Sequence, residues 1–389
     1  MMEIKVIDNL DDNVIEKLED FGKEDFGEKD SNLDKLNPYG LKKIDDEEAY
    51  PKLDKIIEKF LKYYQGDGEG VFSWVEELNE LAKDSEGENI SYNGDSANQH
   101  YGLPTHINGD YKNGLIYHCL FNAGTNGVED SLKTTDSKDD PDPNNCTLEE
   151  YYKIPEKDRK KGPKDINKLI SKDKDKELKV KIRNVRNNII GPDSLLTKEL
   201  INERNGDERG YYCKKYYKKI LEKNKDFYFN SDVSDENHDV IDKKISEKTN
   251  NLVNIELYPL RSKNKDGAEY EINKFSLFGA YIILYRIGKY LNEVKKDDSI
   301  QKPIFIFRSF TEWKDCIIAA IKNHFNFDED TADELFEYLY DNYFLEFSSP
   351  NAGSVSSVNV MKKVRIGNER FDKMTACISE PKKPKNSAK

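Results

Sequence analysis

The sequence predicts an α/β fold, a three-layer sandwich in which helices cover both faces of a central, mostly parallel sheet. Three short apolar runs are typical of buried strands, and helical patterns separate the last two runs and follow the third. The runs are residues 115–121, 252–258 and 303–307. Because parallel strands need a long crossover between them, this alternation favours a parallel sheet.

The first 95 residues are predicted to form an acidic helical subdomain. Apolar residues recur at helical spacing from Leu53 to Tyr64, and a second helical pattern starts at Val71 after a glycine-rich break. The first hundred residues contain 27 Asp and Glu against 12 Lys and Arg, whereas the whole chain has a net charge of −13. The acidity is therefore local, and the rest of the chain is free to bind a polyanion.

Residues 96–375 are expected to form the α/β domain, with residues 127–205 as a charged insertion. Between Lys153 and Arg186 there are 14 Lys and Arg against 6 Asp and Glu. Helices are expected over residues 275–291 and 313–325, and another is expected to open at Thr331, whose Thr-x-x-Glu spacing is that of a capping box. Residues 376–389 are basic and contain prolines, so we expect a disordered tail.

A second basic segment, residues 211–219, alternates lysines with tyrosines. Cations can neutralise phosphates while tyrosine faces stack on bases, which favours nucleic-acid binding. An ordinary lysine-rich helix with its tyrosines in the core explains the same pattern. Both interpretations stay open.

Composition and motif searches exclude several classes of protein. No apolar run approaches the ~18–20 residues of a membrane span, and the start has no signal-peptide core, so we expect a cytoplasmic protein. The five cysteines are scattered, without a CxxC pair or zinc-finger spacing to a histidine, which predicts free thiols and no metal or cofactor. No GxSxG or HExxH motif is present.

Polar and special-backbone residues gather where the strands are expected to end. The segments are residues 103–126, 254–263, 305–313 and 347–359. In an open α/β sheet the carboxyl ends of the strands face a common crevice, where ligands bind. We therefore expect the functional site at this edge.

Two of these segments resemble motifs of the uracil-DNA glycosylase-like superfamily, in particular a bacterial branch similar to phage-defence glycosylases that excise modified bases. The segment LFNAG, Leu120 to Gly124, is similar to the first motif, a strand ending in Gly-x-Asn-Pro-Gly, with Ala123 at the usual proline. Residues 349–356 resemble the last motif, a [His/Asn]-Pro-Ser-x-x-Ser loop that enters the minor groove, but without the histidine.

The resemblance implies a metal-independent DNA glycosylase that flips a base and cleaves its N-glycosidic bond. Asn122 would orient the attacking water. Arg308 or Asn351 would stabilise the departing base in place of the missing histidine, and Arg308 would also grip phosphates. Glu256 falls at the base-reading position; an ionised carboxylate only accepts hydrogen bonds, so it suits the amino group of a cytosine-type base, including a modified one. The residues expected to contact the nucleotide or the DNA are Phe121, Gly124, Thr125, Tyr258, Ser262, Ser349, Pro350, Asn351, Ser354 and Ser356.

Structural interpretations stand beside these roles. Asn122 is also explained by a turn between a strand and a helix, and Glu256 by a structural ion pair. Tyr258 is also explained as a core residue, and Arg308 by a salt bridge at the end of the sheet. Residues 349–356 are also explained as an ordinary surface loop. Two other functions remain open: a non-catalytic nucleic-acid- or protein-binding module with the same fold, and a nucleotide- or nucleoside-processing enzyme. The charge asymmetry also suggests that residues 1–90 cover the basic groove and inhibit binding.

Overall fold

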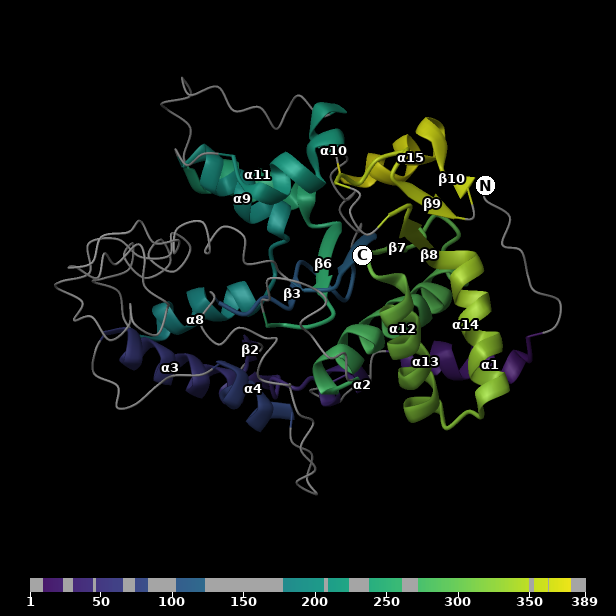
Figure 1. The fold of residues 1–389 in the computed structure, drawn as a ribbon, viewed down its shortest axis with the longest axis horizontal. Helices are drawn as coiled ribbons and strands as arrows, with labels where there is room; N and C mark the ends of the chain where they lie inside the picture. Colours follow the sequence, from purple (N-terminus) through teal and green to yellow (C-terminus); the bar gives the residue numbers. More distant parts are fainter. Residues whose placement is uncertain are drawn as a thin grey trace, which may run out of the picture.

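The computed structural model of the 389-residue chain forms a sheet with helices on both faces (Figure 1). The described residues are 10–23, 31–44, 47–65, 74–82, 103–122, 178–205, 209–223, 238–260, 272–349, 353–362 and 364–378. The predicted α/β class is confirmed. Among the described residues, no helix is both long and apolar enough to cross a bilayer.

The sheet has eight strands in the order β10-β9-β8-β7-β4-β6-β3-β5. They are β3 (Ile107–Asn108), β4 (Ile116–Leu120), β5 (Ile190–Gly191), β6 (Leu252–Glu256), β7 (Ile304–Phe307), β8 (Phe344–Phe347), β9 (Val360–Lys362) and β10 (Val364–Arg365). The four adjacent strands β8, β7, β4 and β6 are parallel, while β3 and β9 run antiparallel to their inner neighbours. The three predicted strands are therefore present as β4, β6 and β7, and the sheet is mixed.

The four parallel strands lie in the order 2-1-3-4 when they are numbered along the chain, because β6 and β7 flank β4. Every residue of β4 and β6 is buried, as expected for strands covered on both faces. The chain direction across the sheet changes between β4 and β7, so this pair forms the topological switch point. Open α/β sheets bind their ligands outside the carboxyl ends of the strands at such a point.

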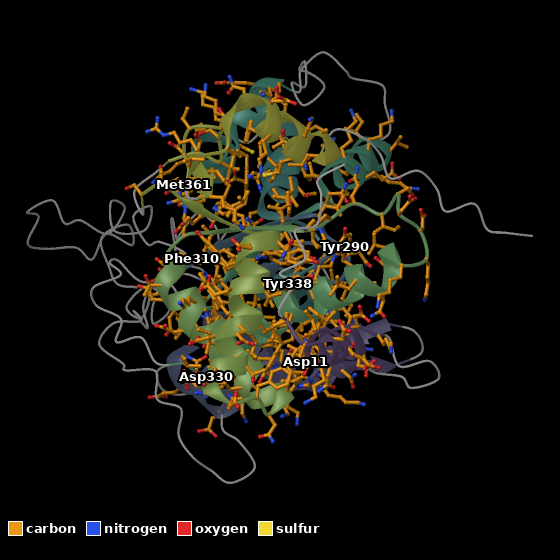
Figure 2. All side chains as sticks on the ribbon, turned by 90° about the vertical axis from the view of Figure 1, so that its right-hand side faces the viewer. Asp11, Tyr290, Phe310, Asp330, Tyr338 and Met361 are labelled. Atoms are coloured by element: carbon orange, nitrogen blue, oxygen red, sulfur yellow. The ribbon has the colours of Figure 1, made fainter. Side chains whose placement is uncertain are left out.

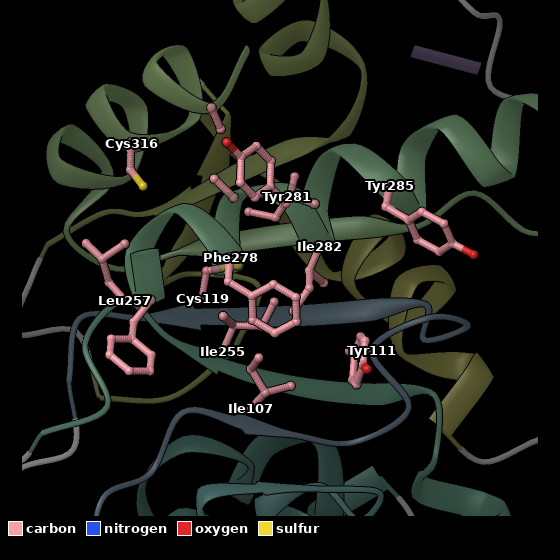
Figure 3. Packing of buried hydrophobic residues seen from close by; sticks show 14 of the residues in the cluster. Ile107, Tyr111, Cys119, Ile255, Leu257, Phe278, Tyr281, Ile282, Tyr285 and Cys316 are labelled. Atoms are coloured by element: carbon pink, nitrogen blue, oxygen red, sulfur yellow. The ribbon is translucent and has the colours of Figure 1, made fainter. Parts of the chain in front are cut away.

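One face of the sheet is covered by α12 (Lys274–Val294), α13 (Phe310–Phe325) and α14 (Glu329–Tyr343). Together with α1 (Asp12–Phe21), α2 (Asn32–Lys35), α3 (Pro51–Gln65), α4 (Trp74–Ala82) and α8 (Leu178–Ile189) they form what we call the α12 layer. Phe278 and Ile282 of α12 point toward Ile107 and Ile255 of the sheet (Figure 3). Most of α12 is buried because the sheet lies on one side and α1 packs on the other.

The N-terminal elements belong to this layer. They are α1 (Asp12–Phe21), α2 (Asn32–Lys35), β1 (Lys42–Ile44), β2 (Glu47–Ala49), α3 (Pro51–Gln65) and α4 (Trp74–Ala82). The helix predicted from Leu53 is confirmed as α3, but β1 and β2 pair as an antiparallel ribbon, so the segment is not purely helical. Val14, Leu18 and Phe21 of α1 belong to the same continuous core as α12 and the sheet.

The opposite face carries the η2 layer and a second core. This layer contains the π-helix η2 (Tyr212–Tyr216) and four α-helices, which Figure 1 labels: α9 (Leu195–Arg204), α10 (Lys218–Lys223), α11 (His238–Thr249) and α15 (Gly367–Thr375). Residues 178–205, at the end of the expected insertion, supply α8, β5 and α9, which are built into the layers and the sheet edge. Ile378 is fully buried in η5 (Ala376–Ile378), so the expected tail cannot begin at residue 376.

The expected start of α14 is also corrected. Thr331 does not open its helix: the side chain of Asp328 accepts a hydrogen bond from Thr331 N at 2.9 Å, and α14 begins at Glu329. The described part of the basic segment 153–186 lies in α8, which packs against α3 of the N-terminal segment, where Arg186 pairs with Asp54, while the η2 layer lies across the sheet (Figure 1). The inhibition of binding by residues 1–90 stays a prediction. Asp11 and Asp330 lie near one end of the molecule, away from Met361 of β9 (Figure 2).

Candidate functional site

The candidate site lies on the η2 side of the sheet, at the carboxyl ends of the parallel strands. Leu120 pairs with Glu256, and Arg308 N donates to Cys119 O at 2.8 Å just after β7. This register aligns Glu256, Leu120 and Arg308 in one row across the switch point. Two residues earlier along the strands, His118 pairs with Asn254, and these two residues form a second row on the same face.

The π-helix η2 covers these two rows with tyrosines. Tyr217 N donates to Tyr212 O at 2.9 Å, five residues back, which is the defining hydrogen bond of a π-helix. The carboxylate of Glu199 holds the start of η2, because its oxygens accept from Tyr212 N at 2.9 Å and from Cys213 N at 2.6 Å. Short π-helices are rare and occur frequently at functional sites.

Glu256 is a buried carboxylate at the end of β6, with an exposed fraction of 1%. Its backbone N donates to His106 O at 2.8 Å, and the Tyr212 hydroxyl lies 3.5 Å from its Oε1, a long hydrogen bond. The negative charge of Glu256 adds to burial in raising the pKa of the Cys119 thiol. The structure therefore holds a hydrogen-bond acceptor at the edge where the sequence expects the base-reading group.

Arg308 connects the strand end to the C-terminal loop. Its guanidinium lies 4.5 Å from the ring centroid of Tyr216 and 4.3 Å from that of Phe347, and its Nη2 donates to Gly353 O at 3.0 Å. Val355 N of the same loop donates to Tyr216 O at 2.8 Å. Burial lowers the pKa of Arg308, and the nearby tyrosines and Glu256 oppose that shift.

His118 lies behind this row as a neutral imidazole. Its Nδ1 is 2.9 Å from the Tyr217 hydroxyl, which also accepts from the Asn254 amide. Burial lowers the pKa of His118 well below its ordinary value, and the charge of Arg308 adds to the effect.

Two residues expected to stack on the base lie on the other face of the sheet. Phe121 and Tyr258 are buried in the core of the α12 layer, where their rings pack edge to face at 5.3 Å. The Asn122 side chain donates to Leu260 O at 3.4 Å, beside the segment that follows β6. The stacking roles of Phe121 and Tyr258 and the water-orienting role of Asn122 stay predictions.

The structure describes Ser349 and residues 353–356 of the loop that resembles the last motif, residues 349–356. Ser349 is exposed, Ser354 O accepts from the Asn359 amide at 2.9 Å, and the buried Ser356 accepts through its carbonyl from Val360 N at 3.0 Å. The expected site residues Gly124, Thr125, Ser262, Pro350 and Asn351 lie outside the described residues.

A comparison of the chain with protein-family models, curated proteins and solved structures finds no match. The function therefore has to be inferred from the chemistry of the site. In the part of the chain that the structure describes, no three His, Cys, Asp or Glu side chains lie close enough together to hold a metal ion. Cys119, Cys213 and Cys316 are free and buried.

Sequence reasoning found Glu256 and Arg308 but missed the residues that surround them. His118 and Asn254 had a local signal, because each lies two positions before a residue at its strand end and so shares its face. Tyr212, Tyr216 and Tyr217 lie in the segment 211–219 that the sequence singles out for its lysines and tyrosines, but no local pattern places that segment against the strand ends. The structure brings all of these groups together on one face, and places Phe121 and Tyr258 on the other.

Proposed function

We propose that the protein is a DNA glycosylase that hydrolyses the N-glycosidic bond of a flipped, modified cytosine-type base and leaves an abasic site. The observation that carries this proposal is the buried carboxylate of Glu256, in register with Arg308 at the carboxyl ends of the strands. The resemblance to phage-defence glycosylases favours phage DNA as the substrate, in the cytoplasm, as an antiviral activity.

The chemistry assigns a role to each group. Glu256 accepts from the exocyclic amino group of the base, while the Tyr212 hydroxyl orients one of its oxygens. As the bond breaks, negative charge develops on the leaving base and positive charge on the sugar, so a cation near the base lowers the barrier. Arg308 is that cation, and Asn122 orients the attacking water.

The test is excision from duplexes that carry uracil, cytosine, hydroxymethylcytosine or glucosylated hydroxymethylcytosine, read out as alkali-labile abasic sites. We expect cleavage at a modified cytosine. Glu256→Gln should lower excision by roughly 5- to 150-fold, the effect of losing one base-edge contact worth about 1–3 kcal/mol. Asn122→Ala should abolish it with folding intact.

The matched control is Glu346→Gln, since Glu346 is a partly buried acid on β8, which β7 and β4 separate from β6, and it accepts from the Tyr340 hydroxyl at 3.0 Å. This variant should keep wild-type excision. Absence of cleavage on all four duplexes, or full activity of Glu256→Gln and Asn122→Ala, would refute the assignment.

A second candidate is a non-catalytic nucleic-acid- or protein-binding module. The contacts of Arg308 favour it, because the guanidinium is held between two rings and by Gly353 O. An arginine with these contacts stabilises the loop whether or not a substrate binds. DNA binding without any abasic product would support this module over the glycosylase.

A further inference from the structure

A continuous series of rings and cations leads from the surface of the molecule to Arg308. Tyr211 is 53% exposed, and its ring centroid lies 5.5 Å from that of Tyr216. The ammonium group of Lys215 lies 5.0 Å from the Tyr211 centroid and 5.8 Å from the Tyr216 centroid. Tyr216 in turn packs under the guanidinium of Arg308.

The π-helix explains why these groups align. In an α-helix, residues five positions apart point about 140° away from each other, since each turn takes 3.6 residues. The wider turn of η2, closed by the bond from Tyr217 N to Tyr212 O, brings Tyr211 and Tyr216 to the same side. An exposed ring is thereby fixed next to the candidate site.

This segment is also strongly basic. Residues 209–223 contain one acid, Glu222, and six bases, which are Arg209, Lys214, Lys215, Lys218, Lys219 and Lys223. Four of the bases already pair with carboxylates: Arg209 with Glu203, Lys218 and Lys219 with Glu222, and Lys223 with Asp372. Lys214 and Lys215 are exposed and form no ion pair within the described ranges.

We propose that Tyr211, Lys214 and Lys215 form a docking platform for a nucleic-acid strand, in which a base stacks on Tyr211 and the two ammonium groups contact flanking phosphates. An exposed ring beside cations that no carboxylate neutralises is what a single strand recognises without sequence preference. Lys215 Nζ donates to the Tyr211 hydroxyl at 2.7 Å, which holds one of these cations at the edge of the ring. An acidic peptide would satisfy the lysines, but it would have no flat ring to cover Tyr211. This inference rests on the proposed function, since it gives the strand a path next to the site.

The test is binding of the full chain to a fluorescent oligothymidylate of about 15 nucleotides, a length that covers the usual single-strand site. Anisotropy is measured at several salt concentrations, and thymine keeps the measurement independent of excision. Tyr211→Ala should weaken binding by roughly 5- to 100-fold because stacking is lost, whereas Tyr211→Phe should restore it.

The lysines are tested by the salt dependence. Lys214→Gln combined with Lys215→Gln should lower the slope of log affinity against log salt by about 1.4, which is about 0.7 for each lost phosphate contact on a single strand. The control is Lys296→Gln, since Lys296 is an exposed lysine that follows α12 in the opposite layer. It should leave the slope close to that of the wild type.

Several outcomes would overturn the platform: no binding by the wild type at low salt, unchanged binding by Tyr211→Ala, or Tyr211-dependent binding of polyglutamate in place of DNA. An unchanged unfolding midpoint for Tyr211→Ala shows that the fold is intact. Intact, Tyr211-dependent binding with no excision of any base would support the platform and refute the proposed function, so the two failures are distinguishable.

Discussion

Two buried histidines illustrate how single residues are controlled by their surroundings. His106 and His118 are both fully buried, and each has its Nδ1 2.9 Å from a tyrosine hydroxyl, that of Tyr39 and of Tyr217 respectively. Burial lowers the pKa of His106 to about 3, although its hydrogen bond with the Phe275 backbone acts in the opposite direction. Both imidazoles are therefore neutral in the folded protein at pH 7.

The pKa of His106 predicts a loss of stability in acid. The folded pKa lies below the unfolded value, so the unfolded chain binds one more proton between about pH 6.5 and about pH 3. The contribution of the neutral His106 to the free energy of unfolding is fully present above pH 6.5, and it falls by about 1.4 kcal/mol per pH unit as the pH decreases within that window. Urea unfolding at pH 7.5, 6 and 5 should therefore show a shallower pH dependence for His106→Gln than for the wild type.

His324→Gln is the comparison for this experiment, because partial burial also lowers the pKa of His324 but by less than full burial lowers that of His106, so its replacement should flatten the pH dependence less. Equal pH dependence of His106→Gln and the wild type would contradict the role of burial at His106.

At the scale of elements, α1 and α12 cross at two glycines. A Cβ on Gly288 would lie 2.1 Å from Leu18 O, and a Cβ on Gly22 would lie 2.1 Å from Lys289 N. The two backbones therefore touch, and the Asn292 amide donates to Glu19 O at 2.6 Å. The periodicity of a helix predicts which face is apolar, but it does not predict which two backbones meet.

Gly288→Ala should separate these helices. The added methyl group meets backbone atoms, so α1 has to shift, and the expected loss is about 1–3 kcal/mol, as for overpacked cores, in spite of the higher helix propensity of alanine. Urea unfolding measures the loss. Gly279→Ala in the same helix is the comparison and should cost less, because its nearest neighbour is a ring atom of Trp313 at 3.1 Å. Equal losses would contradict the importance of the crossing.

At the scale of the whole molecule, the N-terminal elements are part of the main core. Leu18, Leu53 and Phe60 are fully buried in the same cluster as residues of α12 and the sheet. In addition, the Arg186 guanidinium of α8 donates to both carboxylate oxygens of Asp54 in α3, at 3.0 and 2.9 Å. Asp54 of the acidic N-terminal segment is therefore neutralised within the α12 layer, on the opposite face of the sheet from η2.

Deleting residues 1–90 should consequently destabilise the protein rather than uncover a DNA-binding groove. The deletion exposes the apolar surface of α12, so we expect increased binding of a hydrophobic dye and loss of a single cooperative unfolding transition. Truncation after Ile378 is the control, since the sequence predicts a disordered tail there. A cooperative fold with raised DNA affinity after the N-terminal deletion would instead support autoinhibition.

Local residue patterns are enough to predict the α/β class, the positions of β4, β6 and β7, and the helices α3, α12 and α13, because a strand buried on both faces is a continuous apolar run and a packed helix repeats its apolar residues about every 3.6 positions. They also predict that Glu256 and Arg308 lie at strand ends. The strand order, the crossing of α1 with α12 and the packing of Tyr216 from the π-helix against Arg308 are visible in the fold alone. These contacts join residues far apart in the chain, and their energies depend on a packing that no local pattern records.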